Sequence, residues 1–487
     1  MNAELLQTAH ACLPEISLVL GALLLLAIDL GFGARLGDRE RMRTAVVLGV
    51  FAVFAAIYHT VAIGSPGPIF GGAFMFDRLA TATRLGVLVL AQLTLLISAG
   101  SRLRNSAEFV AILLFATTGL LLMATAHQLL LGFLAVELAS LSLYVLAGFD
   151  KTRRESAEAA LKYFLVGGIS SAFLLFGFSL IYGLTGSIQL PVIARQLASQ
   201  PLTPLLVVAL VMVVVAFGFK IAAAPFHLWA PDVYEGAPTP ATALIASASK
   251  LAGFAFFARL FWVGFNRTSG TLATAVPQPG WMFIVAILVI LALLVGNLGA
   301  LAQGNVRRLL AYSAIANAGA ILLGVLAVPQ AGYGPLVLYA TTYGLATVGA
   351  FGVIAILEQT GRCESFGDLA GLHRRSPLLA GCLLVFILSL AGIPPLAGFV
   401  GKFTVFAAAL KLNGLGGILG WVTVLAILLS AVALYYYLLI LKAALVTRAP
   451  AEAPKLRVEA APLAGLLITA ALLVVLGVFP SLLLGLL

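Results

Sequence analysis

Residues 204–250 read PLLVVALVMVVVAFGFKIAAAPFHLWAPDVYEGAPTPATALIASASK. The run begins with an apolar stretch long enough to cross a bilayer as a helix, which takes about 20 residues. It also contains Lys220 and Lys250, although a lysine at the centre of a spanning helix costs about 2.5 to 3.5 kcal/mol on insertion scales. Charged residues kept at such a cost predict a membrane protein whose function depends on them.

The composition of the whole chain agrees with this prediction. Of its 487 residues, 62% are hydrophobic and 9% are charged, against roughly 45–50% and 25% in a typical soluble domain. This composition excludes a soluble enzyme and predicts an all-α polytopic membrane protein. The formal net charge of +10 is typical of basic cytoplasmic loops, and we expect no nucleic-acid partner.

Apolar segments separated by charged or Gly- and Pro-rich loops predict about 14 transmembrane helices. No polar stretch between them is long enough for a separate soluble domain, which takes about 50 residues, so we expect a single membrane domain over 1–487. The segments lie near residues 13–32, 44–63, 76–99, 106–125, 127–148, 158–183, 203–223, 240–263, 281–301, 307–328, 333–357, 377–410, 418–442 and 461–486.

Basic residues predict the orientation of the chain, because loops rich in Lys and Arg stay in the cytoplasm. One set of alternate loops holds eighteen Lys and Arg residues and the opposite set holds three. We therefore expect both termini on the outer, periplasmic face of a bacterial plasma (inner) membrane. The N-terminus lacks the features of a signal peptide, so we expect the first segment to be retained.

Residues 224–239, APFHLWAPDVYEGAPT, are predicted to form a cytoplasmic loop that departs from this charge pattern. They carry Asp232 and Glu235 but no Lys or Arg. We expect the loop to support the neighbouring broken helix and to contact a partner.

Seven basic residues fall within the predicted segments. For Arg78, Arg84 and Arg259, which lie near segment ends, the favoured interpretation is that the side chains reach back to the lipid headgroups. The full set comprises Arg78, Arg84, Lys162, Lys220, Lys250, Arg259 and Lys402.

Two of the deepest ionisable residues are Lys250 and Glu137, each near the middle of a segment. A lone buried charge is either neutralised or paired. For Glu137 the alternatives are a protonated carboxyl group and an ion pair, for which Lys220 is the favoured partner. Pro225 follows Lys220 and is expected to break that helix and free backbone carbonyls.

The twelfth segment contains a second predicted break, in LSLAGIPPLAGFVGKFTVFAAAL at residues 388–410. Pro394 and Pro395 cannot donate backbone hydrogen bonds. A kinked structural helix would explain the prolines alone, but the prolines together with Lys402 favour an ion site.

The two breaks predict a repeat. Segments seven and twelve are an odd number of spans apart, so a repeat that relates them would be inverted, as in many secondary transporters. The halves would be 106–263 and 281–442, flanked by 13–99 and 461–486.

Together these groups predict proton transfer. Burial disfavours the charged form of a lysine, so a buried lysine can gain and lose a proton near neutral pH, and a nearby carboxylate biases that equilibrium. We expect polar side chains and water to complete the relay. Its charged members would be Glu137, Lys220, Lys250 and Lys402, with supporting roles for Lys162, Pro225, His227, Tyr312, Ser313, Pro394 and Pro395.

Four runs also carry a resemblance: FGFKIAAAPFHLWAPDVYEGAPTPATALIASASK, NVRRLLAYSAIANAG, AALKYFLVGG and LSLAGIPPLAGFVGKF. They resemble the antiporter-like membrane subunits of respiratory complex I, the proton-pumping NADH:quinone oxidoreductase, and are most similar to the subunit N family. The resemblance implies fourteen helices in two inverted five-helix repeats with broken helices 7 and 12. It also implies a multi-pass, non-redox subunit of a translocase in the respiratory electron-transport chain. By the family's pattern, Glu137 matches the fifth-helix glutamate, Lys220 the seventh-helix lysine, Lys250 the central eighth-helix lysine, and Lys402 the twelfth-helix residue that closes the outward half-channel.

The resemblance implies partners that hold the redox groups. We expect other membrane subunits of the complex as partners, including neighbouring antiporter-like subunits, together with the lipid bilayer. Flavin, iron–sulfur clusters and quinone would belong to partner subunits. Cys12, Cys363 and Cys382 form no CxxC pair, and no Cys/His cluster has metal-ligand spacing, so we expect no cofactor or metal in this chain.

Two positions depart from the family's pattern. Asn317 stands where relatives commonly carry His, and Ser142 where a Pro is common. The first leaves the path between Lys250 and Lys402 without a protonatable group, for which water or Tyr312 is the expected substitute.

Two other functions remain as alternatives. A subunit of a multisubunit cation/proton antiporter should bind a cation with several deep carboxylates, whereas only Glu137 is evident. A purely structural scaffold would not need four buried ionisable groups on broken helices.

Overall fold

Long apolar runs form the helices of this chain, because in a bilayer each backbone group must find its hydrogen bond within its own segment. The structure is a computed structural model that describes residues 2–101, 103–274, 276, 278–359, 361, 363–412, 414–448, 456 and 458–486. Four basic residues used to predict the orientation, Arg102, Arg362, Lys455 and Arg457, lie outside the described residues.

Within these residues, 13 helices are long and apolar enough to cross a membrane. They are α2 (Leu13–Phe32), α3 (Asp38–Ile63), α4 (Arg78–Ser98), α5 (Ser106–Thr125), α6 (Leu129–Ala147), α7 (Arg154–Thr185), α9 (Pro204–Ile221), the helical region Thr239–Gly264, α13 (Trp281–Leu301), α14 (Val306–Leu326), α16 (Gly334–Leu357), α20 (Ile418–Leu445) and α21 (Ala460–Val478).

Other, shorter elements flank, connect or accompany these helices. They are α1 (Asn2–Ala11), α8 (Leu190–Leu197), α10 (Trp229–Gly236), α15 (Val328–Ala331), α17 (Leu372–Arg375), α18 (Pro377–Ala391), α19 (Ala397–Leu410), α22 (Ser481–Leu484) and the hairpin of β1 (Gly67–Ile69) and β2 (Phe74–Phe76).

The twelfth predicted segment forms two helices. Helix α18 ends at Ala391, Gly392 follows in the left-handed region with φ 85°, and α19 begins at Ala397. Thirteen spanning helices and this divided segment agree with the predicted polytopic all-α architecture.

The prediction that residues 224–239 form a loop is wrong for about half of its length. After α9 ends at Ile221, the chain turns and forms α10 over Trp229–Gly236. The residues of α10 are largely buried, because its Trp, Tyr, Val and Ala side chains pack into the bundle even though it is too short to appear as an apolar segment.

The eighth predicted segment is interrupted at Ser247, which the sequence analysis did not anticipate. Helix α11 (Thr239–Ala246) ends there, Ser247 takes φ −118° and ψ −83°, and α12 (Ala248–Arg259) begins one residue later, followed by the π-helical turn Leu260–Gly264. This interruption lies three residues before Lys250, and the helical region around it is buried.

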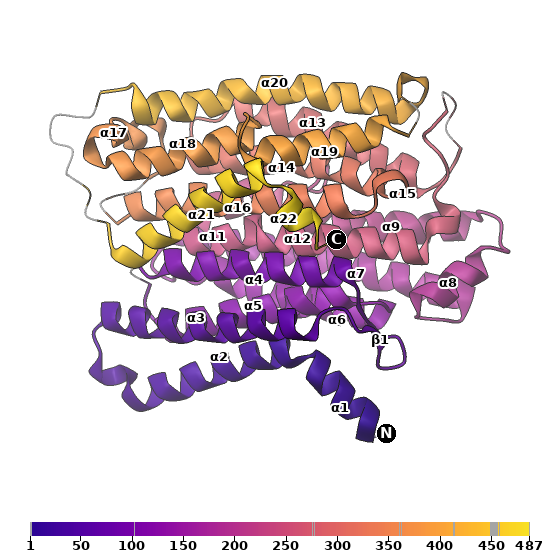
Figure 1. Cartoon of the computed structure of the whole chain (residues 1–487), viewed down its shortest axis with the longest axis horizontal. Coiled ribbons are helices and arrows are strands. Elements are labelled where there is room, and N and C mark those ends of the chain that lie inside the picture. Colours follow the sequence, from indigo (N-terminus) through magenta and orange to yellow (C-terminus); the bar gives the residue numbers. More distant parts are fainter. Residues whose placement is uncertain are drawn as a thin grey trace.

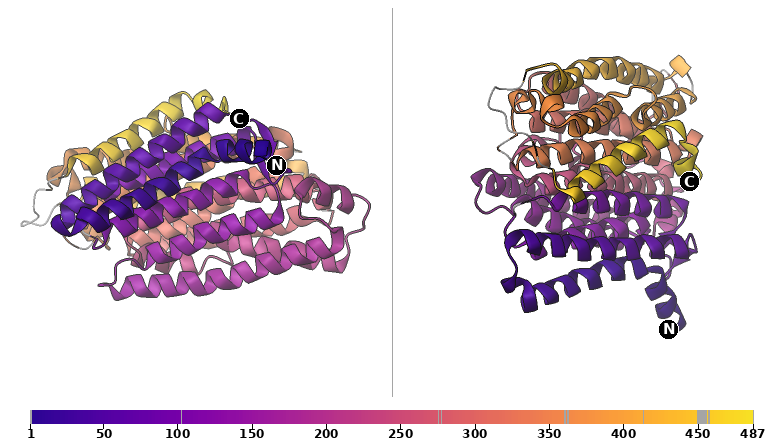
Figure 2. Two further views of the ribbon diagram at one scale, coloured as in Figure 1. Left: turned by 90° about the horizontal axis from the view of Figure 1, so that it is seen from below. Right: turned by 60° about the vertical axis from the view of Figure 1, so that its left-hand side comes forward.

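The helices pack side by side, with α2 and α3 on one side of the bundle and α20 on the other (Figures 1 and 2). Helix α21 returns to contact α4 and α16. Helices α12, α14 and α16 are almost entirely buried, whereas α2, α3, α7 and α20 each leave an apolar face exposed. Lys220, Lys250 and Lys402 are buried in this bundle, whereas Glu137 is only partly buried.

Candidate functional site

Lys220 lies in the last turn of α9, where burial leaves it 5% exposed. Its Nζ donates to Ser140 Oγ of α6 at 3.0 Å. Glu137 lies one turn before Ser140 on the same face of α6 and accepts a hydrogen bond from Ser171 of α7. The expected ion pair between Glu137 and Lys220 is wrong for this structure, because the two serines take the polar contacts instead. Glu137 still lies within electrostatic reach of Lys220.

A small cavity lies beside Lys220 and the two serines. It measures about 10 Å³, close to the space that one water molecule needs, and Ser140, Ser171 and Lys220 contribute to its wall. The two serine hydroxyls and the ammonium supply the polar partners that a buried water requires.

The break after α9 follows from the residues around Pro225. Ala222 adopts the left-handed region with φ 58° and ends the helix. The carbonyl of Phe219 accepts hydrogen bonds from the backbone N–H of Ala222 at 3.0 Å and from the indole Nε1 of Trp229 at 3.1 Å. His227 lies in the turn and its ring meets that of Tyr312 edge-on, with 6.4 Å between centroids.

Lys250 lies in the first turn of α12 and is 1% exposed. Its Nζ donates to the carbonyl of Ala314 in α14 at 2.9 Å and lies 5.7 Å from the ring centroid of Tyr343. A carbonyl and an aromatic face both favour a cation.

Lys402 reaches back from α19 to the break in the twelfth segment. Its Nζ donates to the carbonyls of Leu390 at 2.9 Å and Ala391 at 3.2 Å. These carbonyls are left free by the end of α18, and an ammonium group is favoured there because the C-terminus of a helix carries partial negative charge. The side chain is 8% exposed.

A group of hydroxyls and one amide lies beside Lys250. Ser313 Oγ and Tyr437 Oη are 2.5 Å apart, Asn317 Nδ2 donates to Tyr437 Oη at 3.2 Å, and Tyr339 Oη donates to Asn317 Oδ1 at 2.7 Å. Ser313 and Asn317 were singled out from the sequence, whereas Tyr339 and Tyr437 were missed. The available signal was a tyrosine within an otherwise apolar span, since a buried phenol needs a hydrogen-bond partner.

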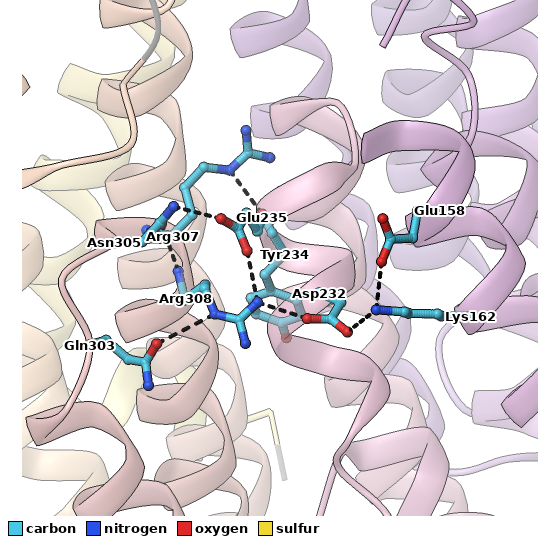
Figure 3. A network of polar contacts seen from close by, with 9 residues as sticks. All are labelled: Glu158, Lys162, Asp232, Tyr234, Glu235, Gln303, Asn305, Arg307 and Arg308. Atoms are coloured by element: carbon cyan, nitrogen blue, oxygen red, sulfur yellow. Dashed lines mark hydrogen bonds and ion pairs between the residues drawn. The ribbon is translucent and has the colours of Figure 1, made fainter. Parts of the chain in front are cut away.

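A second polar cluster joins α7, α10 and α14 (Figure 3), and we call it the Asp232 network. Asp232 accepts from Lys162 Nζ at 2.5 Å and from Arg308 Nη1 at 2.7 Å. Arg308 Nη1 also donates to Glu235 at 2.7 Å, and Lys162 pairs with Glu158 at 2.7 Å. Burial raises the pKa of Asp232, but the hydrogen bonds from Lys162 and Arg308 outweigh this effect and hold the pKa below its usual value.

The Asp232 network accounts for the acidic residues that the sequence left unexplained. Both Asp232 and Glu235 form ion pairs within the chain. They tie α10 to α7 and α14, whereas the expected support of the broken helix stays a prediction.

The snorkelling interpretation is wrong for two of the three arginines. Arg84 is 1% exposed and pairs with Glu15 at 2.7 Å, and Arg259 is 1% exposed and pairs with Asp77 at 2.7 Å. Each meets a carboxylate from another segment, so neither needs to reach the headgroups. Arg78 alone is exposed.

The buried arginines and the buried lysines differ in whether a carboxylate pairs with them. Arg84, Arg259 and Arg307 each have a carboxylate partner, the last being Glu358 at 2.8 Å. Among the residues that the structure describes, no carboxylate lies within ion-pairing distance of the three deep lysines, whose partners are a hydroxyl and backbone carbonyls. Arginine stays protonated in proteins, whereas lysine can lose its proton. The three deep lysines therefore lack the counter-ion that each of these buried arginines has.

Residues 126–430 match the family described as NADH:quinone oxidoreductase/Mrp antiporter, TM. The chain belongs to this family. The matched residues hold Glu137, Lys220, Lys250 and Lys402, and with them the groups that connect these residues.

Within this family, the chain is similar to proteins named as subunit N of NADH-quinone oxidoreductase. The chain is 47% identical over 482 residues to NADH-quinone oxidoreductase subunit N 2 of Acidobacterium capsulatum, covering 97% of this chain and 96% of the relative. It is 40% identical over 420 residues to NADH-quinone oxidoreductase subunit N of Desulforamulus reducens, covering 85% and 84%. The resemblance stated from the sequence is confirmed.

Solved structures agree on the fold. A chain of respiratory complex I from Thermus thermophilus, with 33% identity, superposes with a TM-score of 0.78 over 97% of this chain and 98% of that one. A chain of the Mrp complex from a Dietzia species superposes with a TM-score of 0.83 over 100% and 96% at 21% identity, which shows a shared fold alone.

Proposed function

We propose that this chain is a proton-translocating membrane subunit of an NADH:quinone oxidoreductase and that Glu137, Lys220, Lys250 and Lys402 relay the protons. The observation that carries the proposal is the contrast between buried arginines, all ion-paired, and the three deep lysines, which lack a carboxylate partner among the described residues. A buried ammonium without a counter-ion is expensive, so a neutral amine is an accessible state at each of these positions.

The partners of the lysines support this role. The Ser140 hydroxyl and the carbonyls of Ala314 and Leu390 accept hydrogen bonds from the nitrogen and bring no full negative charge. Such contacts favour the ammonium form but supply no counter-ion, so the nitrogen can lose its proton without leaving a partner carboxylate unpaired. Glu137, held by Ser171, lies on α6 three residues from Ser140, which accepts the hydrogen bond from Lys220.

The energy for this transport comes from outside the chain in our proposal. The relatives are subunits named for NADH and quinone chemistry, and within the described residues no group of three His, Cys, Asp or Glu side chains could hold a metal ion. We place flavin, iron–sulfur clusters and quinone in partner subunits, with neighbouring antiporter-like subunits in the same bacterial inner membrane and both termini on its outer face.

Lys250→Ala in the intact complex tests the proposal. The assembled complex is reconstituted in vesicles, and NADH oxidation and proton uptake are recorded on the same sample. Because loss of an acid–base group typically costs about 10²–10⁴-fold, we expect NADH-driven proton uptake to fall at least tenfold. Lys411→Ala, an exposed lysine at the end of α19, is the matched control and should pump normally. A Lys250→Ala complex that assembles and pumps like the wild type would contradict the proposal.

Purification from native membranes separates this function from cation/proton antiport, which the Mrp-like fold also accommodates. We expect the tagged chain to elute with flavin, iron and inhibitor-sensitive NADH:quinone activity. An assembly without cofactors that exchanges Na⁺ for H⁺ would assign the chain to the antiporters instead.

A further inference from the structure

A cavity of about 670 Å³ opens where the helices α4 and α16 begin. Both helices are long and apolar enough to span the membrane, so their first residues lie at a membrane surface, at the depth of the lipid headgroups. None of the four proposed relay residues contributes to this cavity. Its wall includes Asp77, Arg78, Leu79, Tyr333, Gly334 and Leu484.

The cavity carries a positive charge that its wall leaves unbalanced. Among the described residues of the wall, Asp77 is the only carboxylate, and Arg259 already holds both of its oxygens, at 2.9 Å and 2.7 Å. Arg78 is exposed, and its side chain forms no ion pair or hydrogen bond in the part of the chain that the structure describes. Two guanidinium groups therefore accompany one carboxylate, and the cavity attracts an anion.

Neutral donors lie beside Arg78. The hydroxyl of Tyr333 has no hydrogen-bond partner among the described residues, and burial raises the pKa of Tyr333 above its usual value, so the phenol keeps its proton at neutral pH. Helix α16 begins without a side-chain cap, and the first backbone N–H groups of a helix favour an anion. A guanidinium, a phenol and free N–H groups together suit the oxygens of a phosphate group.

The size of the cavity indicates a ligand larger than a phosphate ion. A volume of about 670 Å³ falls within the range of small-molecule sites, which is about 300–1,000 Å³. A free phosphate ion is only a few water molecules in size and would leave most of this space unfilled. The remaining wall is apolar at Leu79, Pro335 and Leu484, so the ligand needs an apolar part as well.

An exposed apolar surface continues from the cavity along the last two helices. Helix α22, which carries Leu484, contacts α16 and α21, and α21 contacts α4 (Figure 1). Val478, Phe479 and Leu482 are 52%, 59% and 58% exposed. Contiguous exposed apolar side chains on a membrane protein mark contact with acyl chains. An anionic group in the cavity and an acyl chain on this surface fit one molecule.

We propose that this cavity binds an anionic phospholipid, whose phosphate group contacts Arg78 and Tyr333 and whose acyl chain lies along Phe479 and Leu482. The lipid joins the start of α4 to the start of α16 and to α22. Its phosphate supplies the counter-ion that Arg78 lacks within the described residues. Because no relay residue takes part, the inference does not depend on the proposed function.

Photo-crosslinking in the intact complex tests the inference. The complex is reconstituted in phosphatidylcholine vesicles with a trace of phosphatidylglycerol that carries a photoactivated diazirine on its acyl chain, and labelled peptides are located by mass spectrometry. We expect label on residues 478–486. Arg78→Gln should lower this label about fivefold, the contribution of one basic residue at an anionic membrane surface, and Tyr333→Phe about threefold, as for one hydrogen bond.

Arg267→Gln is the matched control. Arg267 is exposed in the loop before α13, which the alternation of spanning helices places on the same membrane surface as Arg78, and it does not line the cavity. The label should stay at the wild-type level. In the wild type, unlabelled phosphatidylglycerol should suppress the label, whereas added phosphatidylcholine or inorganic phosphate should not.

Four results would overturn the inference. Equal labelling of Arg78→Gln and the wild type would show that Arg78 does not recognise the headgroup, and equal suppression by phosphatidylcholine would leave only an apolar surface. Suppression by inorganic phosphate would assign the cavity to free phosphate. No label in the assembled complex would show that a partner chain covers the cavity. If Arg78→Gln does not assemble, Tyr333→Phe and the suppression series in the wild type decide.

Discussion

Arg84 and Glu15 form an ion pair inside the helix bundle, with 2.7 Å between the guanidinium Nη2 and the carboxylate Oε2. The pair ties α4 to α2, and both side chains are almost fully buried. Gly86, two residues nearer the middle of α4, lies against Leu251, so the same helix that Arg84 anchors packs beside the residue next to Lys250.

We expect Arg84→Met to lower the free energy of unfolding by about 3–5 kcal/mol, because it leaves the Glu15 carboxylate buried without a partner. The double variant Arg84→Met/Glu15→Leu should recover most of that loss, since an apolar pair of similar volume often replaces a buried ion pair at little cost. Thermal unfolding in detergent measures both. Equal destabilisation in the single and double variants would show that packing, and not charge, is responsible.

Lys402→Arg separates the structural role of Lys402 from its proposed transport role. A guanidinium keeps a cation near the free carbonyls of Leu390 and Ala391 but does not release a proton. We expect near-normal assembly and thermal stability together with a loss of NADH-driven proton uptake of about 10²-fold or more, as for the loss of an acid–base group. Lys402→Met should lose both stability and pumping. Normal pumping by the arginine variant would remove Lys402 from the relay.

Glu137→Gln should keep the hydrogen bond from Ser171 and lose the charge that acts on Lys220. We expect normal assembly and a pumping defect that resembles that of Lys220→Ala. Glu137→Asp retains the charge and should be milder. Proton uptake per NADH oxidised is the measurement, and equal severity of the two glutamate substitutions would indicate a packing role.

The Asp232 network predicts a dependence of stability on pH. The pKa of Asp232 is lower in the folded state than in the unfolded state. The carboxylate therefore adds stability above its unfolded-state pKa of about 3.9. This contribution disappears as the pH falls through the folded-state pKa. We expect Asp232→Asn to lower the unfolding temperature at neutral pH and to approach the wild type in acid.

Glu158→Gln is the control within the same network. Glu158 is 58% exposed, and exposed ion pairs contribute little, so its unfolding temperature should stay close to that of the wild type. A deficit of Asp232→Asn that is unchanged in acid would contradict the ionic origin of its effect.

Hydropathy predicted the spanning helices because membrane insertion depends on the sum of side-chain transfer energies along a segment, which any sequence displays. The same sum failed at residues 224–239. Helix α10 is short and contains Asp232 and Glu235, so its average polarity suggested a loop, while its burial depends on Lys162 and Arg308 from other helices.

Partners across helices were beyond the sequence for a similar reason. Tyr437 and Asn317 are 120 residues apart along the chain, and their contact depends on how α14 and α20 are rotated against each other. Lys220 has Ser140 instead of Glu137 as its hydrogen-bond partner because of a one-turn difference on α6. For Arg84 a signal was present: Glu15 is an acidic residue near the start of an apolar segment, and two opposite charges at similar membrane depth favour a pair.

The two helix breaks are sealed by groups of different kinds. The carbonyl of Phe219 is held by the indole of Trp229, which keeps its hydrogen throughout, whereas the carbonyls of Leu390 and Ala391 are held by the ammonium of Lys402. A charged donor makes a stronger hydrogen bond than a neutral one. In the proposed relay, each loss of a proton from Lys402 replaces a charged donor with a neutral one, so the carbonyls at the end of α18 are held less strongly until the lysine is protonated again.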